Sequence, residues 1–257
     1  MTASPLFDIE GKRAVVTGGG SGIGTMIARG FVQAGARVII ASRKEPSLKE
    51  VADELSAIGE CSYIVADLST EEGCRSLGAA VAERWDALDV LVNNAGANWG
   101  APLAEQDHAS WQRVLSVNVE GVFHTTKFLL PLLQAAGTVD APARVINIGS
   151  VDGIQVPGFE TYAYSASKAA VHQMTRHLAK HLAPTITVNA IAPGPFQSRM
   201  MRATLEAAGD QMPKMMPLKR IGRDEDMAGA AIFLASEASS FMTGAIIPVD
   251  GGIVTTK

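Results

Sequence analysis

The sequence predicts an α/β protein with one doubly wound sheet of seven parallel strands and helices on both faces. Short runs rich in Val, Ile and Ala alternate with longer helical patterns along the whole chain, and almost every residue in those runs is apolar. Strands that are covered on both faces have this composition, and their alternation with helices calls for right-handed parallel crossovers. The expected strands are 13–17, 37–42, 63–67, 89–93, 144–149, 187–192 and 245–249.

One domain is expected over residues 1–257, because no Ser-, Gly- or Pro-rich linker divides the chain and no repeat other than the strand–helix alternation occurs. The stretch between Pro193 and Gly222 departs from this alternation, since it is rich in Met and Pro and contains no strand pattern. Ligands bind beyond the strand ends of such sheets, so we predict a substrate lid at about 195–220. An ordinary loop with a short helix is the alternative.

Charge, hydropathy and cysteine usage exclude several kinds of protein. The net charge is −4 and the 22 basic residues are scattered, so no surface for a nucleic acid or a membrane is expected. Asp8 and Glu10 interrupt the region where a signal peptide would be apolar, and no later apolar run reaches the ~20 residues that span a bilayer. Cys61 and Cys74 lack metal-site spacing and are expected to be reduced thiols. We therefore expect a cytoplasmic protein without a metal.

A glycine-rich turn, TGGGSGIG at 17–24, joins the first expected strand to the first helical pattern. Gly18, Gly22 and Gly24 allow the backbone to turn tightly and to approach a pyrophosphate, while the helix N-terminus offers free N–H groups and a partial positive charge. Because the turn lies directly between strand and helix, it predicts a Rossmann-type dinucleotide site. The expected contacts within the turn are Gly18, Ser21, Gly22, Ile23 and Gly24.

The end of the second strand indicates which dinucleotide binds. An NAD-specific fold of this type has an acidic residue there, about 20 residues after the turn, which binds the ribose 2′-hydroxyl. This chain has Ser42, Arg43 and Lys44 instead. A guanidinium forms paired hydrogen bonds with a 2′-phosphate, whereas a carboxylate would repel it. These three residues are therefore expected to bind NADP(H); the alternative is that the two basic side chains are simply solvated in a loop.

Tyr164 and Lys168 stand four residues apart at the start of a long helical pattern, so they share one helix face. Lowering the pKa of a phenol from ~10 to about 7 needs roughly 4 kcal/mol, which a nearby ammonium in a partly dry cleft can supply. Tyr164 is then expected to act as a general acid–base at neutral pH. Ser150 ends the fifth strand, where its hydroxyl is expected to hold a substrate carbonyl. Asn118 is expected to hold a water beside Lys168.

These features, and the order in which they occur along the chain, resemble the short-chain dehydrogenase/reductase family over essentially the whole length. The resemblance implies a catalytic tetrad of Asn118, Ser150, Tyr164 and Lys168. It also implies a homotetramer or homodimer in which the C-terminal strand region joins subunits. The matching motifs are Thr17-Gly18-x-x-x-Gly22-x-Gly24, Asp67, Asn93-Asn94-Ala95-Gly96, Asn118, Ser150, Tyr164-x-x-x-Lys168, Pro193-Gly194 and Asp250-Gly251-Gly252.

The resemblance implies further contacts to the cofactor beyond the glycine turn and the end of the second strand. One set would meet the adenine, a second would line the cofactor, and a third would face the nicotinamide carboxamide. Tyr164 and Lys168 would also touch the cofactor, Lys168 through the nicotinamide ribose hydroxyls. The three sets are Asp67 and Leu68; Asn94, Ala95 and Gly96; and Pro193, Gly194, Phe196 and Ser198.

The implied reaction is the NADPH-dependent reduction of a ketone to a secondary alcohol, with Tyr164 as the proton donor. Within the family, the strings VNNAGANWGAPL, YAYSASKAAVHQM and NAIAPGPFQSRM are most similar to the 3-oxoacyl reductase subgroup of rhamnolipid biosynthesis. This similarity implies a small-molecule carbonyl substrate, a 3-oxoacyl thioester or a β-keto ester. The expected substrate contacts are Trp99, Ser150, Gln155, Tyr162, Tyr164 and Phe196.

Two other functions stay open. An NAD(P)+-dependent alcohol, sugar-alcohol or steroid dehydrogenase would use the same fold and tetrad in the opposite direction. A non-catalytic dinucleotide-sensing protein would use only the cofactor site, and the intact tetrad argues against it. A metal site at His177 and His181 is disfavoured because the segment lacks the acidic residue of an H-E-x-x-H motif.

Overall fold

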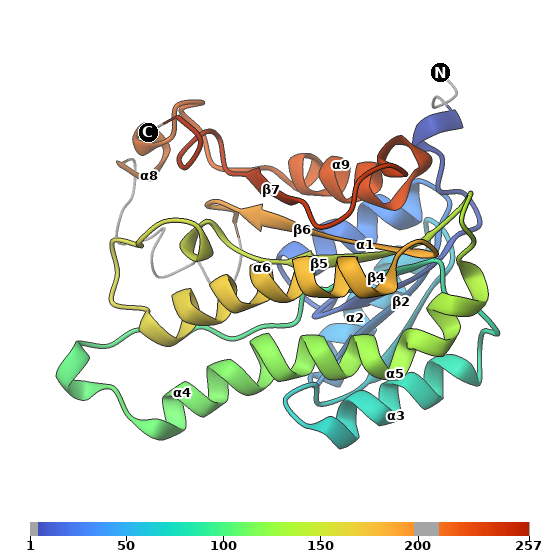
Figure 1. The fold of residues 1–257 in the computed structure, drawn as a ribbon, viewed down its shortest axis with the longest axis horizontal. Helices are drawn as coiled ribbons and strands as arrows, with labels where there is room; N and C mark the ends of the chain where they lie inside the picture. Colours follow the sequence, from blue (N-terminus) through green and yellow to red (C-terminus); the bar gives the residue numbers. More distant parts are fainter. Residues whose placement is uncertain (1–4, 198–210, 257) are drawn as a thin grey trace.

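Seven parallel strands form one sheet in the computed structural model, which describes residues 5–197 and 211–256 (Figure 1). Their order across the sheet is β3-β2-β1-β4-β5-β6-β7, and every neighbouring pair is parallel. The predicted fold class is confirmed. The strands are β1 (Arg13–Thr17), β2 (Arg37–Ser42), β3 (Cys61–Val65), β4 (Val90–Asn93), β5 (Ala143–Ile148), β6 (Ile186–Pro193) and β7 (Ile246–Val249).

The edge strand β3 begins at Cys61 and ends at Val65, so it lies two residues earlier than the predicted 63–67. Only one of its five residues is fully buried, because an edge strand is covered less completely than the central ones. The prediction relied on a continuous apolar run and therefore placed the strand too late. Asp67 consequently lies in the loop after β3 rather than in the strand itself.

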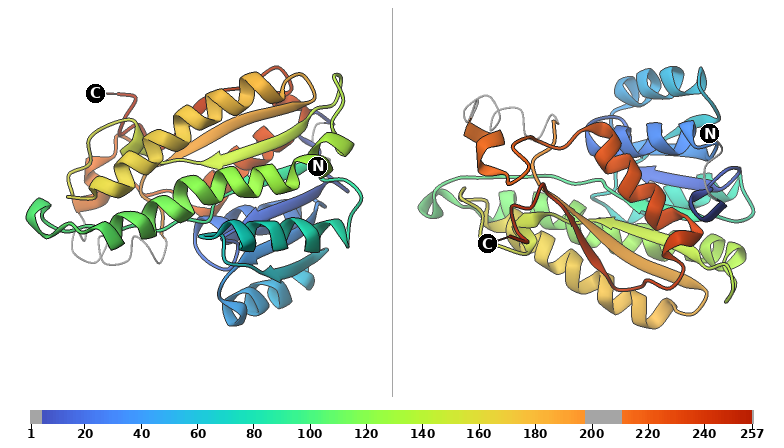
Figure 2. Two further views of the ribbon diagram at one scale, coloured as in Figure 1. Left: turned by 60° about the horizontal axis from the view of Figure 1, so that its bottom comes forward. Right: turned by 90° about the horizontal axis from the view of Figure 1, so that it is seen from above.

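Helices cover both faces of the sheet (Figure 2). α1, α2 and α9 pack on one face, and α3, α5 and α6 pack on the other. Successive strand residues point to opposite faces, so Val16 enters the first core and Val15 the second. The helices are α1 (Ile23–Gln33), α2 (Glu45–Ser56), α3 (Glu71–Ala82), α4 (His108–Leu115), α5 (Gly121–Ala136), α6 (Tyr162–Leu182), α8 (Gln211–Met215) and α9 (Asp224–Ala235), with the 3-10 turns η1 (Pro5–Phe7), η2 (Leu103–Glu105), η4 (Val151–Gly153) and η5 (Glu237–Ser239).

A turn of π-helix, η3 (Ser116–Glu120), joins α4 to α5. The three elements follow one another as a long helix that extends beyond the sheet (Figure 1). π-turns are rare and occur often at functional sites. Asn118 lies in this turn and its side chain is fully buried. Within 5–197 and 211–256, no helix combines the length and the hydropathy that crossing a bilayer requires.

The strand order reverses between β1 and β4, and ligands bind at such a reversal in open parallel sheets. Thr17, the last residue of β1, joins the two strand ends there. Its hydroxyl donates to the Val92 carbonyl (3.1 Å) and accepts from the backbone N–H groups of Asn94 (2.8 Å) and Ala95 (3.0 Å). The turn after β1 and the loop after β4 are therefore held together at the carboxyl edge of the sheet.

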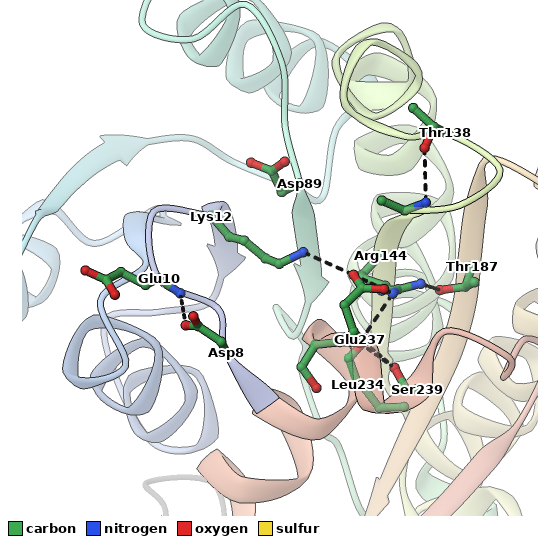
Figure 3. A network of polar contacts seen from close by, with 12 residues as sticks. Asp8, Glu10, Lys12, Asp89, Thr138, Arg144, Thr187, Leu234, Glu237 and Ser239 are labelled. Atoms are coloured by element: carbon green, nitrogen blue, oxygen red, sulfur yellow. Dashed lines mark hydrogen bonds and ion pairs between the residues drawn. The ribbon is translucent and has the colours of Figure 1, made fainter. Parts of the chain in front are cut away.

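A buried arginine organises the opposite edge, where the strands begin (Figure 3). Arg144 is 1% exposed, and its guanidinium contacts Thr187 Oγ1, the Ser236 carbonyl and Glu237 Oε1 at 3.3–3.4 Å. Lys12 Nζ lies 3.7 Å from the same Glu237 oxygen. Burial lowers the pKa of Arg144, and Glu237 opposes that effect. The network connects β5 and β6 to the end of α9, far along the strands from the glycine turn.

Part of the predicted lid can be placed. Residues 198–210, including Ser198, lie outside the described residues. On either side of them, Phe196 forms an isolated parallel bridge with Gly222, and α8 is a short helix. The lid at about 195–220 stays a prediction.

The contact between α1 and α9 depends on a glycine. A Cβ on Gly30 would lie 2.5 Å from Ala228 Cβ, so we expect Gly30→Ala to push the two helices apart and to lower the free energy of unfolding by about 1–3 kcal/mol. Gly229 on α9 is exposed and has open space at its Cβ position, so Gly229→Ala should raise stability by about 0.5–1 kcal/mol. Thermal and urea unfolding measure both; equal effects of the two variants would contradict this packing.

Candidate active site

The glycine turn opens directly onto the N-terminus of α1. Gly18 and Gly22 have positive φ values of 68° and 58°, which residues with a side chain rarely adopt. A Cβ on Gly24 would overlap the Gly18 carbonyl, so the turn and the helix can meet only without side chains. No side chain caps α1 at Gly22, and its first turn has no acidic residue. These free N–H groups and the bare backbone fit a pyrophosphate.

Arg43 and Lys44 lie just beyond β2, next to the glycine turn, because the Gly18 N–H donates to the Ala41 carbonyl at 2.7 Å. Both side chains are exposed. Arg43 Nε lies 3.8 Å from Asp67 Oδ1 in the loop after β3. Burial acts to raise the pKa of Asp67, but hydrogen bonds from Ser69 and the charge of Arg43 outweigh it, so the pKa is lowered. The structure thus brings Arg43 and Asp67 together at one rim of the expected cofactor site.

The loop after β4 forms the adjoining wall. Asn94 Nδ2 donates to the Thr17 carbonyl (2.8 Å), and a Cβ on Gly18 would lie 2.6 Å from that nitrogen. Asn94, Ala95 and Gly96 therefore line the same edge as the turn. Leu68, by contrast, has its side chain in the hydrophobic core, so only its backbone is available to a ligand.

Asn118 holds this loop against α6. Its Oδ1 accepts from the Ala97 N–H (2.7 Å), and its Nδ2 donates to the Ala97 carbonyl (3.0 Å) and to Ser167 Oγ (2.9 Å). Both hydrogens of the amide are used, so a water beside Lys168 would bind the amide oxygen or the backbone of Asn118, and that water stays a prediction. The side chain holds the loop against the helix.

Ser150, Tyr164 and Lys168 come together where β5 ends. Lys168 is 5% exposed and its Nζ donates to the Ile148 carbonyl at 2.8 Å. The same Nζ lies 5.5 Å from the centre of the Tyr164 ring. The Tyr164 phenol is hydrogen-bonded to Ser150, which acts against the larger effect of burial on the phenol pKa. The i, i+4 spacing on α6 thus places phenol and ammonium on one side, next to the hydroxyl from β5.

The pKa of the Tyr164 phenol is raised in this structure, although the spacing of Tyr164 and Lys168 predicts that it is lowered. Burial raises the pKa of Tyr164 to about 12, and the charge of Asp152 adds to this, against the opposing hydrogen bond from Ser150. Burial also lowers the pKa of Lys168 to about 8, while Asp152 opposes that change. The ammonium lies over the ring and donates to a backbone carbonyl, so it does not offset the loss of solvent around the phenol.

Two residues that sequence reasoning missed belong to the same cluster. Asp152 follows Ser150 by two residues in η4, and its N–H donates to Ser150 Oγ at 3.1 Å. His172 lies one turn after Lys168 on α6 and is 4% exposed. The two signals that could have found them are the closeness of Asp152 to Ser150 and the repeated i, i+4 spacing from Lys168 to His172.

His172 supports the loop that carries Ser150. Burial lowers its pKa to about 4, although a hydrogen bond to the backbone of Gly153 favours the charged form. A Cβ on Gly149 would overlap Nε2, and one on Gly153 would lie 2.9 Å from Cε1. Glycines on both sides of Ser150 therefore let the β5–η4 connection close over the imidazole.

The predicted substrate contacts differ in how far their side chains are exposed. Trp99 and Tyr162 are 39% and 38% exposed and lie on neighbouring segments, since the Ala101 N–H donates to the Glu160 carbonyl at 3.2 Å. Arg113 covers the Trp99 ring at 4.5 Å. Gln155 is half-buried beyond η4. Phe196 is only 2% exposed and packs beside Gly222, so its backbone is the part that can face a ligand.

The Pro193-Gly194 step rests on the Asp250 turn. Pro193 is the last residue of β6, and the Gly194 N–H donates to the Val249 carbonyl at 3.0 Å. A Cβ on Gly194 would lie 2.7 Å from Asp250 Cα. Asp250 in turn accepts from the N–H groups of Gly252 and Val254, both at 2.8 Å. Two distant motifs of the sequence thus form one packed unit at this edge.

Comparisons with known proteins extend over this whole arrangement. The family model described as enoyl-(acyl carrier protein) reductase matches residues 18–254. The chain is 49% identical over 251 residues to the rhamnolipids biosynthesis 3-oxoacyl-[acyl-carrier-protein] reductase of Pseudomonas aeruginosa, with 96% of this chain and 98% of the relative covered. It is 40% identical over 253 residues to the galactitol 2-dehydrogenase (L-tagatose-forming) of Cereibacter sphaeroides, with 96% of each covered.

Solved structures also match this chain over nearly its whole length. The Pseudomonas aeruginosa RhlG/NADP active-site complex superimposes with a TM-score of 0.94 at 49% identity, covering 97% of this chain and 99% of that one. A gluconate 5-dehydrogenase from Burkholderia cenocepacia in complex with NADP and tartrate has a TM-score of 0.89 at 34% identity, covering 97% of each. Since these matches span nearly the whole chain, including the glycine turn and the Ser150–Tyr164–Lys168 cluster, the protein belongs to the short-chain dehydrogenase/reductase family of oxidoreductases.

Proposed function

We propose that the protein is an NADPH-dependent carbonyl reductase that converts a ketone to a secondary alcohol, with a 3-oxoacyl thioester or a β-keto ester as substrate. The observation that carries this proposal is the convergence of Ser150, Tyr164 and Lys168 at the sheet edge that also holds the glycine turn. The 3-oxoacyl reductase at 49% identity supports the substrate class, and the NADP-bound structure at a TM-score of 0.94 supports the cofactor.

Each residue of the cluster has a distinct task. NADPH, when bound, supplies the hydride that is transferred to the carbonyl carbon. Ser150 donates a hydrogen bond to the carbonyl oxygen and to the alkoxide that develops there. Tyr164 delivers its proton to that oxygen as a general acid. Burial raises the pKa of Tyr164 to about 12, so the phenol is protonated at neutral pH but is a weaker acid than an exposed tyrosine. Lys168, held by the Ile148 carbonyl, keeps a positive charge beside the ring.

A dehydrogenase working in the opposite direction is the second candidate, and the 40% identity to a galactitol 2-dehydrogenase favours it. A non-catalytic dinucleotide-sensing protein is the candidate from a different class. Parallel assays separate the three. NADPH consumption is measured with acetoacetyl thioesters, β-keto esters, cyclic diketones, sugars and a 2-enoyl thioester, and NADP+ reduction with the matching alcohols. Turnover of β-keto substrates supports the proposal, whereas dinucleotide binding without any turnover would support the sensor.

Tyr164→Phe removes the proton donor but keeps the ring, so we expect turnover to fall by about 10²–10⁴-fold with little change in NADPH binding. Tyr63→Phe is the matched control, because this tyrosine lies on the edge strand β3, where its hydroxyl donates to Glu45 and not to the cluster. Steady-state kinetics give the turnover and isothermal titration gives the NADPH affinity. Unchanged turnover in Tyr164→Phe would remove the assignment.

Arg43→Asp replaces the proposed 2′-phosphate contact by a repelling carboxylate. We expect the Kd for NADPH to rise roughly 10–100-fold while the Kd for NADH changes little, because a hydrogen bond to a charged group contributes about 1.5–3 kcal/mol. Lys49→Asp on α2 makes the same change of charge at another exposed position and should leave both affinities nearly unchanged. Equal losses for NADPH and NADH would exclude a role for Arg43 in distinguishing them.

We further propose that the protein is a cytoplasmic homotetramer or homodimer joined through its C-terminal strand region. β7 is an edge strand whose four residues, Ile246–Val249, are all partly exposed although they are apolar. Phe241, just before this strand, is fully exposed. Pairing with a second copy would cover both. Light scattering after size-exclusion chromatography should give two or four times the chain mass of 26.9 kDa, and a monomer would overturn this proposal.

A further inference from the structure

The connection that follows the expected cofactor wall is held on both sides of Trp99. On one side, Asn118 binds both the N–H and the carbonyl of Ala97, at 2.7 Å and 3.0 Å. On the other side, the Ala101 N–H donates to the Glu160 carbonyl at 3.2 Å. Trp99 stands midway between these anchors, so its backbone has a defined place in the fold.

An arginine from α4 covers the indole of Trp99. The guanidinium carbon of Arg113 lies 4.5 Å from the ring centre, which is within the range of a cation–π interaction. Arg113 is itself exposed, and Trp99 remains 39% exposed. The indole is therefore held by its neighbour and still has surface that a ligand can contact.

Other exposed apolar side chains lie close to Trp99. Ala101 and Glu160 join the connection after β4 to the segment that leads into α6, and α4 packs against α6. Four exposed apolar or aromatic residues stand within two positions of that hydrogen bond, and we call them the apolar rim. They are Trp99, Leu103, Phe159 and Tyr162.

The apolar rim is close to the reacting groups along the chain. Tyr162 precedes Tyr164 by two residues on α6, and Trp99 follows Gly96 by three. Three extended residues span at most about 11 Å. A substrate whose carbonyl lies at Tyr164 can therefore reach the rim with a substituent of several carbons.

The composition of the rim favours an apolar substituent. An alkyl chain that lies on these side chains loses contact with water, which is favourable for every methylene that is covered. A polyol in the same place would give up hydrogen bonds to water, and apolar side chains offer none in return. The rim therefore distinguishes an acyl chain from a sugar.

We propose that Arg113 is a specificity-determining residue that acts through Trp99. It holds the indole in place, and the apolar rim then favours 3-oxoacyl substrates with longer alkyl chains over short ones and over sugars. Arg113 is a positioning residue, and Trp99 is the residue that touches the chain. This inference rests on the proposed reductase function, because it concerns the part of the substrate that extends from the reduced carbonyl.

The kinetic test compares two N-acetylcysteamine thioesters, 3-oxobutanoyl and 3-oxooctanoyl, with NADPH. Both are uncharged, so Arg113 cannot act on them as an ion-pair partner. The selectivity is the ratio of kcat/KM for the longer substrate to kcat/KM for the shorter one. In wild type we expect kcat/KM to rise by about 2–4-fold for each added methylene that the rim covers. Trp99→Ala should bring the ratio toward one, with kcat for the shorter substrate nearly unchanged.

Arg113→Met keeps the apolar part of the side chain and removes the cation, so we expect the ratio to fall by about 2–5-fold. Arg113→Lys should restore part of it. Arg75→Met is the matched control, because the Arg75 guanidinium lies 4.4 Å from the centre of the Phe128 ring, away from the rim. Equal losses for both thioesters in Arg113→Met, or a wild-type ratio near one, would overturn the proposal while the reductase function stands.

A second measurement needs no turnover. Acrylamide quenching of tryptophan fluorescence is measured in wild type and Arg113→Met, each against the same protein carrying Trp99→Phe, so that the difference reports Trp99. We expect stronger quenching of Trp99 in Arg113→Met, and more protection of Trp99 by octanoyl than by acetyl N-acetylcysteamine in wild type. Identical quenching in the two proteins, or equal protection by the two thioesters, would contradict the proposal. If no ketone is reduced but these differences occur, the reductase function fails while the role of Arg113 at the rim stands.

Discussion

The hydrogen bond from the Lys168 ammonium to the Ile148 carbonyl connects α6 to the end of β5, and the geometry of the site depends on it. Removing an ammonium from water is costly unless it is hydrogen-bonded, so this contact holds the second turn of α6 against the sheet. Tyr164 and Ser150 then meet because one precedes Lys168 by a helical turn and the other follows Ile148 by two residues. The hydrogen bond that stabilises the buried Lys168 ammonium therefore also places Ser150 and Tyr164 close together.

Small residues make the surrounding connections possible. Gly149 and Gly153 leave room for the His172 imidazole, Gly24 for the Gly18 carbonyl, and Gly96 lies beside Asn118. Each lies where a loop from the carboxyl edge crosses another element. The polar contacts that hold these loops, such as those of Thr17 and Asn118, are made mostly to backbone groups. The site is consequently built from closely packed backbone, into which only a few side chains project.

Electrostatics within the cluster depend on solvent exclusion as much as on the neighbouring charges. Lys168 was expected to lower the pKa of Tyr164, yet burial dominates and raises it, and Asp152 acts in the same direction. A protonated phenol suits proton donation to a ketone. The hydrogen bonds of Asn118 likewise depend on its surroundings, because both hydrogens of its amide are donated to Ala97 and Ser167. In both cases the sequence points to the side chain, while its surroundings in the structure decide which contacts it makes.

The sequence by itself determined the parallel α/β sheet, the glycine turn and the shared helix face of Tyr164 and Lys168, because period, spacing and glycine content are local properties of the chain. The tertiary structure alone decided the position of β3, the meeting of Arg43 with Asp67, and the entry of Asp152 and His172 into the cluster. It also decided the sign of the Tyr164 shift. Burial and contacts between distant segments arise only when helices and strands pack, and no local pattern encodes how far each group is removed from water.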